Sequence, residues 1–365
     1  MNTIRFLDLR KQYESIKADI DAAIAQTLES CNFIGGPAVL KFEKEFATFQ
    51  HASHCIGVGN GTDAIEIALG ALELEPDAEV IVPANSFIAS SEAVRTAGLN
   101  VIFCAIDPAT GLLDLTDARA KITTKTKVIL PVHLYGQSCD MDSIMTLAQE
   151  FGLMVVEDCA QAHGAEWRGR RVGTFGICGT FSFYPGKNLG AYGDGGAVVT
   201  NDDALAHRIR MIANHGRTEK YNHEFEGRNS RLDALQAAIL SAKLKYLESW
   251  TNRRAEIAEV YRRELSGIAD LTLPVINLGA RHVFHLFVVR TSRRDELQSH
   301  LKQAGIETGI HYPIALTRLK AYKVTNQTTA SDDLNEQIIS LPIGEHLSDS
   351  EVSRITHEVK CFFGT

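Results

Sequence analysis

The sequence predicts an α/β fold, with a large domain built on a mixed, mostly parallel seven-stranded sheet flanked by helices and a smaller C-terminal α+β domain. Short β-branched segments alternate with helical segments up to residue 201, which is typical of a parallel sheet covered by helices on both faces. Near residue 232 this alternation gives way to a long, charged helical run. The length of 365 residues suits two domains.

The first predicted element is an amphipathic helix over residues 8–30, because apolar side chains recur there at helical spacing. Seven strands are then predicted at residues 55–60, 79–84, 100–106, 127–134, 153–159, 179–185 and 196–201. Helices are predicted between them at residues 62–74, 86–97, 140–151 and 203–213. Only a glycine-rich turn separates the last two strands, so we expect this pair to be antiparallel.

The C-terminal third begins with residues 232–265, which we predict to be a bent connecting helix, since no Pro or Gly interrupts this run. A second αβ unit follows, with a strand, a helix, an intervening segment and a last helix at residues 284–290, 294–304, 309–313 and from Ser348 onward. We place the boundary near residue 245. This gives a large domain over residues 1–245 and a small domain over residues 246–365.

Composition excludes several classes of protein. Hydrophobic residues make up 45% and charged residues 22%, which is typical of globular proteins and not of disordered or fibrous ones. The net charge of −8 comes without a basic tract, which argues against nucleic-acid binding. Seven scattered cysteines suggest a reducing compartment, and no apolar stretch resembles a signal peptide or membrane span. We therefore expect a soluble, cytoplasmic protein, and we expect no metal.

The segment Gly59–Ala64 follows a predicted strand and opens a helix, an arrangement that can hold a phosphate on backbone N–H groups. It also matches the dinucleotide pattern G-x-G-x-x-A, but the acid that this pattern needs about 20 residues later is missing. By itself the segment fits two interpretations equally well. One is an anion site at Gly61 and Thr62, and the other is a tight turn capped by Thr62 or Asp63.

Asp158 lies at the end of one predicted strand and Lys187 follows another, and ligands of parallel sheets bind at the carboxyl ends of the strands. Alone, Asp158 is more simply explained as a cap of the next segment. Gln161 and His163 lie just beyond it and can donate hydrogen bonds to the same crevice. Lys187 stands among aromatic residues and glycines, where partial burial would lower its pKa and make its amine a Schiff-base nucleophile. Alone, Lys187 is slightly better explained as a structural lysine.

Taken together, these residues fit pyridoxal 5'-phosphate. This cofactor needs an anion site, a lysine for its aldehyde and a carboxylate that keeps the ring nitrogen protonated. Gly61 with Thr62, Lys187 and Asp158 supply these groups in that order. Phe87, which follows the strand at 79–84, is a candidate to stack on the ring, although an aromatic residue there is more often part of the core.

Four motifs occur together in the order of one known family, namely GNGTDA (59–64), VEDCAQAHGA (156–165), SFYPGKNLGAYGDGG (182–196) and GRNSRLDALQAA (227–238). The chain thereby resembles the pyridoxal-phosphate-dependent nucleotide-sugar aminotransferases of the DegT/StrS type, which have the aspartate aminotransferase fold (fold type I). The resemblance extends from residues 6–13 to 311–313. Beyond Pro313 a second proline and a histidine are expected, but Ala315 and Thr317 stand there.

The resemblance implies a role for each matching residue. Lys187 would bind the cofactor covalently and move the proton, Asp158 would pair with the ring nitrogen, and Gln161 would bond the ring hydroxyl. The phosphate would be held by Gly61, Thr62 and Ser182, with Asn229 reaching it from the neighbouring subunit of a homodimer with shared active sites. The candidate substrate contacts are Tyr184, Arg231, His311 and Tyr312.

The resemblance also implies the reaction. L-glutamate would give its amine to the cofactor, which would pass it to a keto group of a nucleotide-linked deoxysugar, in amino-sugar biosynthesis for lipopolysaccharide or O-antigen. The loops around Lys187 and Gly61 resemble those of members that aminate 3-keto sugars, so we expect a dTDP- or UDP-linked 3-keto sugar, with a 4-keto sugar as the alternative. Lys187 argues against the dehydratases of this scaffold, in which histidine replaces the lysine. A regulatory protein that binds the cofactor without turnover is the alternative outside enzymes.

Overall fold

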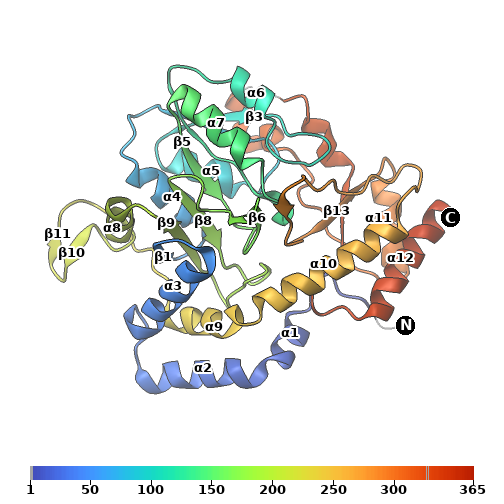
Figure 1. Cartoon of the computed structure of the whole chain (residues 1–365), viewed down its shortest axis with the longest axis horizontal. Coiled ribbons are helices and arrows are strands. Elements are labelled where there is room, and N and C mark those ends of the chain that lie inside the picture. The colour runs from blue at the N-terminus through green and yellow to red at the C-terminus, as the bar shows by residue number, and fades with distance from the viewer. Residues whose placement is uncertain (1–2, 326, 328) are drawn as a thin grey trace.

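The computed structural model describes residues 3–325, 327 and 329–365. A seven-stranded sheet with the order β1-β9-β8-β5-β4-β2-β3 forms its centre (Figure 1). The strands are β1 (His54–Val58), β2 (Glu79–Pro83), β3 (Asn100–Cys104), β4 (Thr126–Ile129), β5 (Met154–Asp158), β8 (Cys178–Ser182) and β9 (Gly196–Thr200). All seven predicted strands lie in this one sheet, which confirms the predicted α/β fold.

Strand directions follow from the lengths of the connections. The neighbours β3, β2, β4, β5 and β8 are parallel. Helices lie in the connections from β2 to β3, from β3 to β4 and from β4 to β5, whereas the long connection from β5 to β8 carries the short strands β6 and β7. The pair β8 and β9 is antiparallel, with Gly179 opposite Val199, and β9 is also antiparallel to β1. The predicted antiparallel pair is thus confirmed, and the sheet is mixed.

Helices cover both faces of the sheet. The helices up to residue 244 are α1 (Leu9–Ser15), α2 (Lys17–Ser30), α3 (Gly36–Gln50), α4 (Gly61–Ala71), α5 (Ala89–Thr96), α6 (Leu115–Ala120), α7 (Met141–Phe151), α8 (Asp203–Ile212) and α9 (Ala234–Leu244), with a 3₁₀ turn η1 (Leu134–Gly136). Side chains of a strand alternate between faces. On β9, Val198 therefore packs in the cluster that contains α4 and α8, while Ala197 and Val199 pack with α3 and α9.

The N-terminal helices differ from the prediction. The single helix expected over residues 8–30 is broken at Ile16, whose backbone is not helical (φ −129°, ψ 22°). The side chain of Ile16 is buried with Ile239 of α9 and with Trp250, and this packing explains why the chain breaks there. Helix α3 was not predicted, because its start at Gly36-Pro37 resembles a turn.

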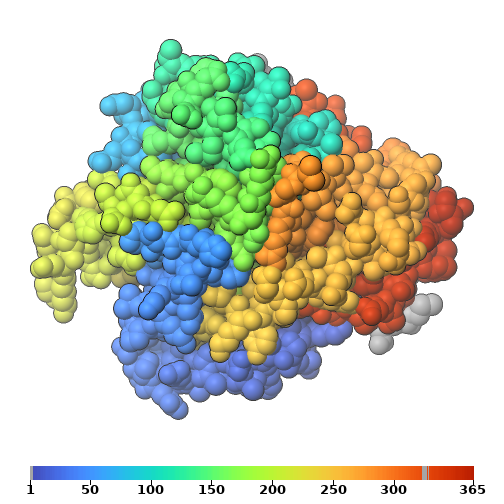
Figure 2. Space-filling model, viewed as in Figure 1, coloured from blue at the N-terminus to red at the C-terminus, as the bar shows by residue number. Residues whose placement is uncertain are grey.

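The C-terminal elements form a third apolar cluster. They are α10 (Leu247–Glu264), β13 (Phe287–Arg290), α11 (Arg294–Gln303), β14 (Ile338–Leu341) and α12 (Asp349–Phe363). Between α11 and β14 lie the 3₁₀ turns η2 (Leu316–Arg318), η3 (Lys320–Thr325) and η4 (Asp332–Glu336), and Leu316 and Tyr322 pack in the cluster that contains α4 and α8. Strands β13 and β14 pair antiparallel. Most of these elements, gold to red, lie together on one side of the molecule (Figure 2).

The predicted connecting helix is two helices, α9 and α10, separated by Lys245-Tyr246. We propose this break as the boundary between the large and the small domain. Short strands complete the fold: β6 (Glu166–Trp167), β7 (Arg170–Arg171) and β12 (Ala280–Arg281) form one sheet, and β10 (Arg217–Glu219) and β11 (Asn222–His223) form a hairpin that projects beside α8 (Figure 1). Among the described residues, no helix has the length and apolar character needed to cross a membrane.

Candidate active site

A cavity of about 810 Å³ lies where β2, β5 and β8 end. It is the place that a parallel sheet offers to a ligand. Residues of the C-terminal elements close it, among them Arg254, His285 and Ile343. The cavity brings together most of the predicted site residues: Gly61, Thr62, Phe87, Asp158, Gln161, Ser182, Tyr184, Lys187, His311 and Tyr312.

One end of the cavity is the N-terminus of α4. Asn60 is the cap of this helix, since its side chain accepts from the N–H of Asp63 (2.8 Å), so neither Thr62 nor Asp63 has the capping role considered above. A Cβ on Gly61 would lie 2.5 Å from Cβ of Ser182, so only glycine allows this close approach. The backbone N–H groups and the positive end of the helix dipole make this a cradle for a phosphate.

Lys187 lies in a tightly closed loop that follows β8. Its N–H donates to the carbonyl of Tyr184 (2.8 Å), and a side chain at Gly190 would collide with the backbone of Pro185. Burial lowers the pKa of Lys187 to about 8, although Asp158 nearby favours the charged form. Its amine lines the cavity and makes no hydrogen bond with the described residues. A purely structural lysine would be paired, so the arrangement favours a reactive amine.

Asp158 is buried at the end of β5, and both of its carboxylate oxygens accept a hydrogen bond. The N–H of Ala160 donates to Oδ1 (3.0 Å), and the hydroxyl of Ser90 donates to Oδ2 (2.7 Å). The first bond is the capping interaction that the sequence suggested. The second bond and the position in the cavity wall show that Asp158 is not only a cap, because its carboxylate also faces the place where a ligand would bind.

The amide of Gln161 has a fixed orientation. Its Oε1 accepts from the N–H of Tyr135 (2.7 Å), and its Nε2 donates to the hydroxyl of Tyr312 (3.0 Å). An amide NH₂ has a second proton, which remains for an oxygen atom in the cavity. Tyr135 in turn donates to the carbonyl of His311 (2.5 Å), so the segment 311–312 is tied to the end of β4 and β5.

His163 was expected to face the same crevice, and this expectation is wrong. The side chain is fully buried among Phe46, Phe181 and Phe183. Burial, with a smaller effect of Lys187, lowers the pKa of His163 to about 3, so the ring is neutral. In contrast, Phe87 is 53% exposed and packs against the ring of Tyr312 in the cavity wall, so it is not a core residue.

The structure adds residues that the sequence analysis did not identify. Ser86 and Ser90 line the cavity beside Asp158, and His285 lines it on the C-terminal side. Arg254 is buried in the wall, where it donates to the carbonyls of Phe284 and Ile343 and pairs with Glu345. Only Ser86 and Ser90 carried a sequence signal, because they follow β2 at the same sheet edge.

Asn229 and Arg231 do not line the cavity of their own chain. Asn229 is exposed, and its backbone forms an isolated antiparallel β-bridge with Asn214. Arg231 donates a hydrogen bond to the side-chain oxygen of Asn214 (3.4 Å). The two unexpected residues after His311-Tyr312-Pro313 also lie outside the cavity. Ala315 and Thr317 are buried, and Thr317 donates to Asp332 (2.8 Å).

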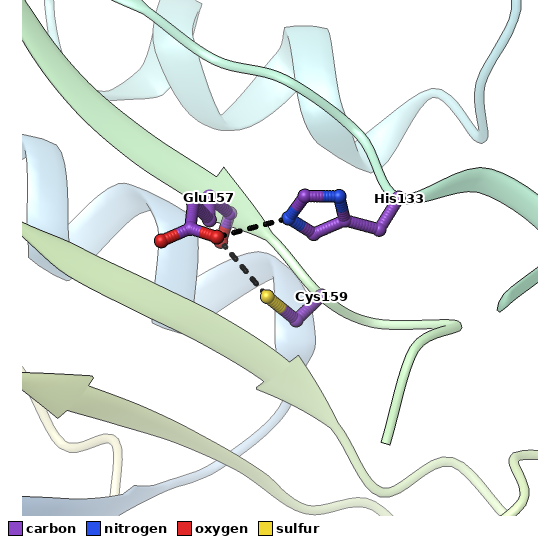
Figure 3. Close-up of side chains that lie close together, drawn as sticks. All are labelled: His133, Glu157 and Cys159. Carbon is purple, nitrogen blue, oxygen red and sulfur yellow. Dashed lines mark hydrogen bonds and ion pairs between the residues drawn. The ribbon is translucent and has the colours of Figure 1, made fainter. Parts of the chain in front are cut away.

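Behind Asp158, on the other face of β5, lies a buried cluster of His133, Glu157 and Cys159 (Figure 3). The carboxylate of Glu157 accepts from Nε2 of His133 (3.0 Å) and from the backbone N–H groups of Gly173, Phe175 and Gly176 (2.7, 2.7 and 2.8 Å). The N–H of Cys139 donates to Nδ1 of His133 (3.1 Å). The carboxylate of Glu157 and Nδ1 of His133 therefore already accept hydrogen bonds from the protein, and these bonds brace the ends of β4 and β5.

Comparison with known proteins extends this description. Residues 14–360 match the DegT/DnrJ/EryC1/StrS aminotransferase family. The dTDP-3-amino-3,4,6-trideoxy-alpha-D-glucose transaminase of Streptomyces venezuelae is 45% identical over 98% of this chain and 95% of that protein. The UDP-N-acetyl-3-dehydro-alpha-D-glucosamine 3-aminotransferase of Acidithiobacillus ferrooxidans is 41% identical over 98% of this chain and 97% of that protein.

Among solved structures, that of S. venezuelae DesV in complex with a ketimine intermediate superposes with a TM-score of 0.97 and 44% identity over 100% of both chains. The similarity therefore covers the cavity and its surroundings as well as the sheet. The residues in the cavity also suit pyridoxal phosphate, with a phosphate cradle at Gly61, a free amine on Lys187 and a buried carboxylate on Asp158. Sequence, fold and site agree, and the chain belongs to the DegT/DnrJ/EryC1/StrS aminotransferase family and is a pyridoxal-phosphate-dependent aminotransferase.

Proposed function

We propose that this enzyme transfers an amino group from L-glutamate to the 3-keto group of a dTDP- or UDP-linked sugar. The observation that carries the proposal is the convergence of Asp158, at the end of β5, and Lys187, in the loop after β8, on one cavity next to the N-terminus of α4. The names of the two relatives above describe a 3-amino sugar and a 3-dehydro sugar, which supports carbon 3 as the reacting position.

In this proposal each side of the cavity has a separate role. Pyridoxal phosphate, when bound, supplies an electron sink for the carbanion that forms at the amino-bearing carbon. Gly61, Thr62 and Ser182 would hold its phosphate, and Phe87 would cover its ring. Asp158 would accept the hydrogen bond of the ring nitrogen, and the remaining amide proton of Gln161 would bond the ring hydroxyl.

Lys187 is the group that moves the proton. Burial lowers its pKa to about 8, so near neutral pH its Nζ can both accept a proton and return it. A general acid–base group works best when its pKa lies near the working pH. The same residue therefore serves both halves of the reaction, as base and as acid.

The substrates enter where exposed aromatic side chains line the cavity. Tyr184 and Phe87 are both more than half exposed there, and His311 and Tyr312 line the same cavity. Burial, followed by the charge of Lys187, lowers the pKa of His311 to about 4, so His311 is a neutral hydrogen-bonding group. We propose that these side chains contact the sugar and its nucleotide.

We further propose a homodimer in which each active site uses residues of both subunits. Leu28 on α2, Leu40 on α3, and Phe33 and Ile34 between these helices are exposed apolar side chains. The carbonyl of Phe33 accepts from the N–H of Ala234 (3.0 Å), so residue 33 lies next to the start of α9, shortly after Asn229 in the chain. Exposed apolar side chains favour a protein interface, and in such a dimer Asn229 would reach the partner's phosphate cradle.

The proposed setting is amino-sugar biosynthesis in the cytoplasm, such as for lipopolysaccharide or O-antigen. The described residues include seven cysteines, all of them free thiols, which suits a reducing compartment.

The proposal is tested by following both halves of the reaction. L-glutamate should bleach the visible absorbance of the purified enzyme, and mass spectrometry should then find an aminated product from a 3-keto nucleotide sugar. The matched 4-keto sugar is the control. Amination at carbon 4 alone would replace the proposed substrate, and an enzyme that keeps its colour with glutamate would be a binding protein without turnover.

A further inference from the structure

Two serine side chains extend from Asp158 toward the start of α5. Ser90 Oγ lies 2.7 Å from Oδ2 of Asp158, and Ser86 Oγ lies 2.7 Å from Ser90 Oγ. Ser86, Ser90 and Asp158 are 3%, 1% and 4% exposed, and all three line the cavity. The three side chains thus form a chain of hydrogen bonds that is shielded from bulk water and ends at the site.

The direction of donation along this chain of hydrogen bonds follows from the carboxylate at its end. An ionised carboxylate only accepts hydrogen bonds, so Ser90 donates its single proton to Asp158. The oxygen of Ser90 can then only accept from Ser86, which is therefore the donor. Both hydroxyl dipoles point toward the carboxylate, and each bond polarises the next.

The other carboxylate oxygen is also bonded, because the N–H of Ala160 donates to Oδ1 (3.0 Å). One donor on each oxygen fixes the plane of the carboxylate. Hydrogen bonds to the charged form of a buried acid favour that form and offset the cost of burial. The hydroxyl of Ser90 and the N–H of Ala160, which no catalytic step uses, therefore fix the orientation of the Asp158 carboxylate.

We propose that Ser90, supported by Ser86, is a positioning residue that keeps the proton of the Asp158 pair on the ring nitrogen of the cofactor. This inference rests on the role proposed for Asp158 above. A proton between two bases stays with the stronger base, and a hydrogen bond from Ser90 makes Asp158 the weaker one. Loss of the Ser90 hydroxyl raises the proton affinity of Asp158 and shifts the proton away from the ring, which weakens the electron sink.

Ser91, which lies outside this hydrogen-bond network, is a matched control. It follows Ser90 on α5 and is also fully buried, but its hydroxyl donates to the carbonyl of Ile88 (3.0 Å) and does not line the cavity. Ser91→Ala removes a buried hydroxyl from the same helix turn without touching Asp158. Ser90→Thr is the conservative variant, because it keeps the hydroxyl.

The test compares these variants as holoenzymes with ¹⁵N-labelled cofactor. In Ser90→Ala the ¹⁵N resonance of the ring nitrogen should move toward that of neutral pyridine, and the half-reaction with glutamate should slow about 10- to 100-fold, which corresponds to one hydrogen bond to a charged group. Ser86→Ala should change the ¹⁵N resonance and the rate of the half-reaction in the same direction as Ser90→Ala, but by less. Ser90→Thr and Ser91→Ala should match the unsubstituted enzyme.

Asp158→Asn, measured under the same conditions, distinguishes the inference about Ser90 from the role proposed for Asp158. If Asp158→Asn shifts the ring nitrogen resonance and Ser90→Ala does not, the inference about Ser90 is wrong and the role of Asp158 stands. If neither variant shifts it, the proposed role of Asp158 is wrong. Equal effects of Ser90→Ala and Ser91→Ala would also overturn the inference, because the effect would then be that of any lost buried hydroxyl.

Discussion

The side chain of Asn188, the residue next to Lys187, holds the imidazole of His285 by a bond of 3.0 Å between Oδ1 and Nδ1. The amide nitrogen of Asn188 donates to the carbonyl of Val283 (3.0 Å), so Oδ1 must be the acceptor and Nδ1 of His285 the donor. Nε2 of His285 therefore carries a lone pair. Burial, followed by the charges of Lys187 and Arg254, lowers the pKa of His285 well below its usual value, so the ring is a neutral hydrogen-bond acceptor in the cavity wall.

This relationship predicts the effect of Asn188→Asp. The new carboxylate still accepts from His285 but cannot donate to the carbonyl of Val283, and an unpaired buried carbonyl costs about 1–3 kcal/mol. A negative charge beside His285 raises the pKa of His285. We expect a lower melting temperature and a new acidic limb in the pH profile of kcat/KM for the nucleotide sugar. An unchanged pH profile would mean that Asn188 does not set the protonation of His285.

A second prediction concerns the capture of the cofactor by Lys187. The pKa of Lys187 is lowered, so its neutral, nucleophilic amine accumulates as the pH rises through about 8. The rate at which apoenzyme gains visible absorbance with pyridoxal phosphate should rise between about pH 7 and 9 and then level off. After borohydride reduction, the cofactor should be found on the peptide that contains Lys187, and Lys187→Ala should capture none.

Lys243 provides the control for this experiment. Burial lowers the pKa of Lys243 to about 8 as well, but its amine donates to the carbonyl of Gly190 (2.6 Å) and does not line the cavity. Lys243→Met should therefore still capture the cofactor. Reduced cofactor on a peptide that lacks Lys187 would contradict the assignment.

A third prediction uses two glycines of α4. Gly61→Ala places a Cβ 2.5 Å from Ser182, so the cradle has to open, and we expect at least tenfold weaker cofactor binding and a loss of about 1–3 kcal/mol of stability. At Gly70, on the same helix, a Cβ meets nothing within 4 Å, so Gly70→Ala should stabilise the protein by about 0.5–1 kcal/mol. Equilibrium dialysis of the cofactor and urea unfolding measure both effects. Equal cofactor affinity in the two variants would show that the close approach at Gly61 does not form the cradle.

A fourth prediction tests the shared active sites. Asn229→Ala and Lys187→Ala chains should each be impaired, because each lacks one part of every site. When the two are mixed and allowed to exchange subunits, the heterodimer has one site with both Lys187 and Asn229, so part of the activity should return. Mass spectrometry of the intact complex shows whether heterodimers form. Heterodimers without activity would mean that Asn229 serves its own chain or none.

The sequence by itself determined the sheet and the main residues at its edge. All seven strands were predicted from local patterns, because apolar and β-branched residues repeat with the period of the element that they form. Asp158 and Lys187 were predicted to meet because parallel strands end at one edge, and both line the cavity. These conclusions depend only on neighbours in the chain and on general topology.

The tertiary structure alone decided which distant side chains meet. Ser90 and Asp158 are 68 positions apart, and Asn188 and His285 are 97 positions apart, so no local pattern pairs them. The break at Ile16 and the burial of His163 among phenylalanines likewise depend on packing against distant segments. Periodicity fixes which face of an element is apolar. The protonation, orientation and partners of a polar side chain depend on what the fold brings within about 3 Å of it, and that is set only when the whole chain has packed.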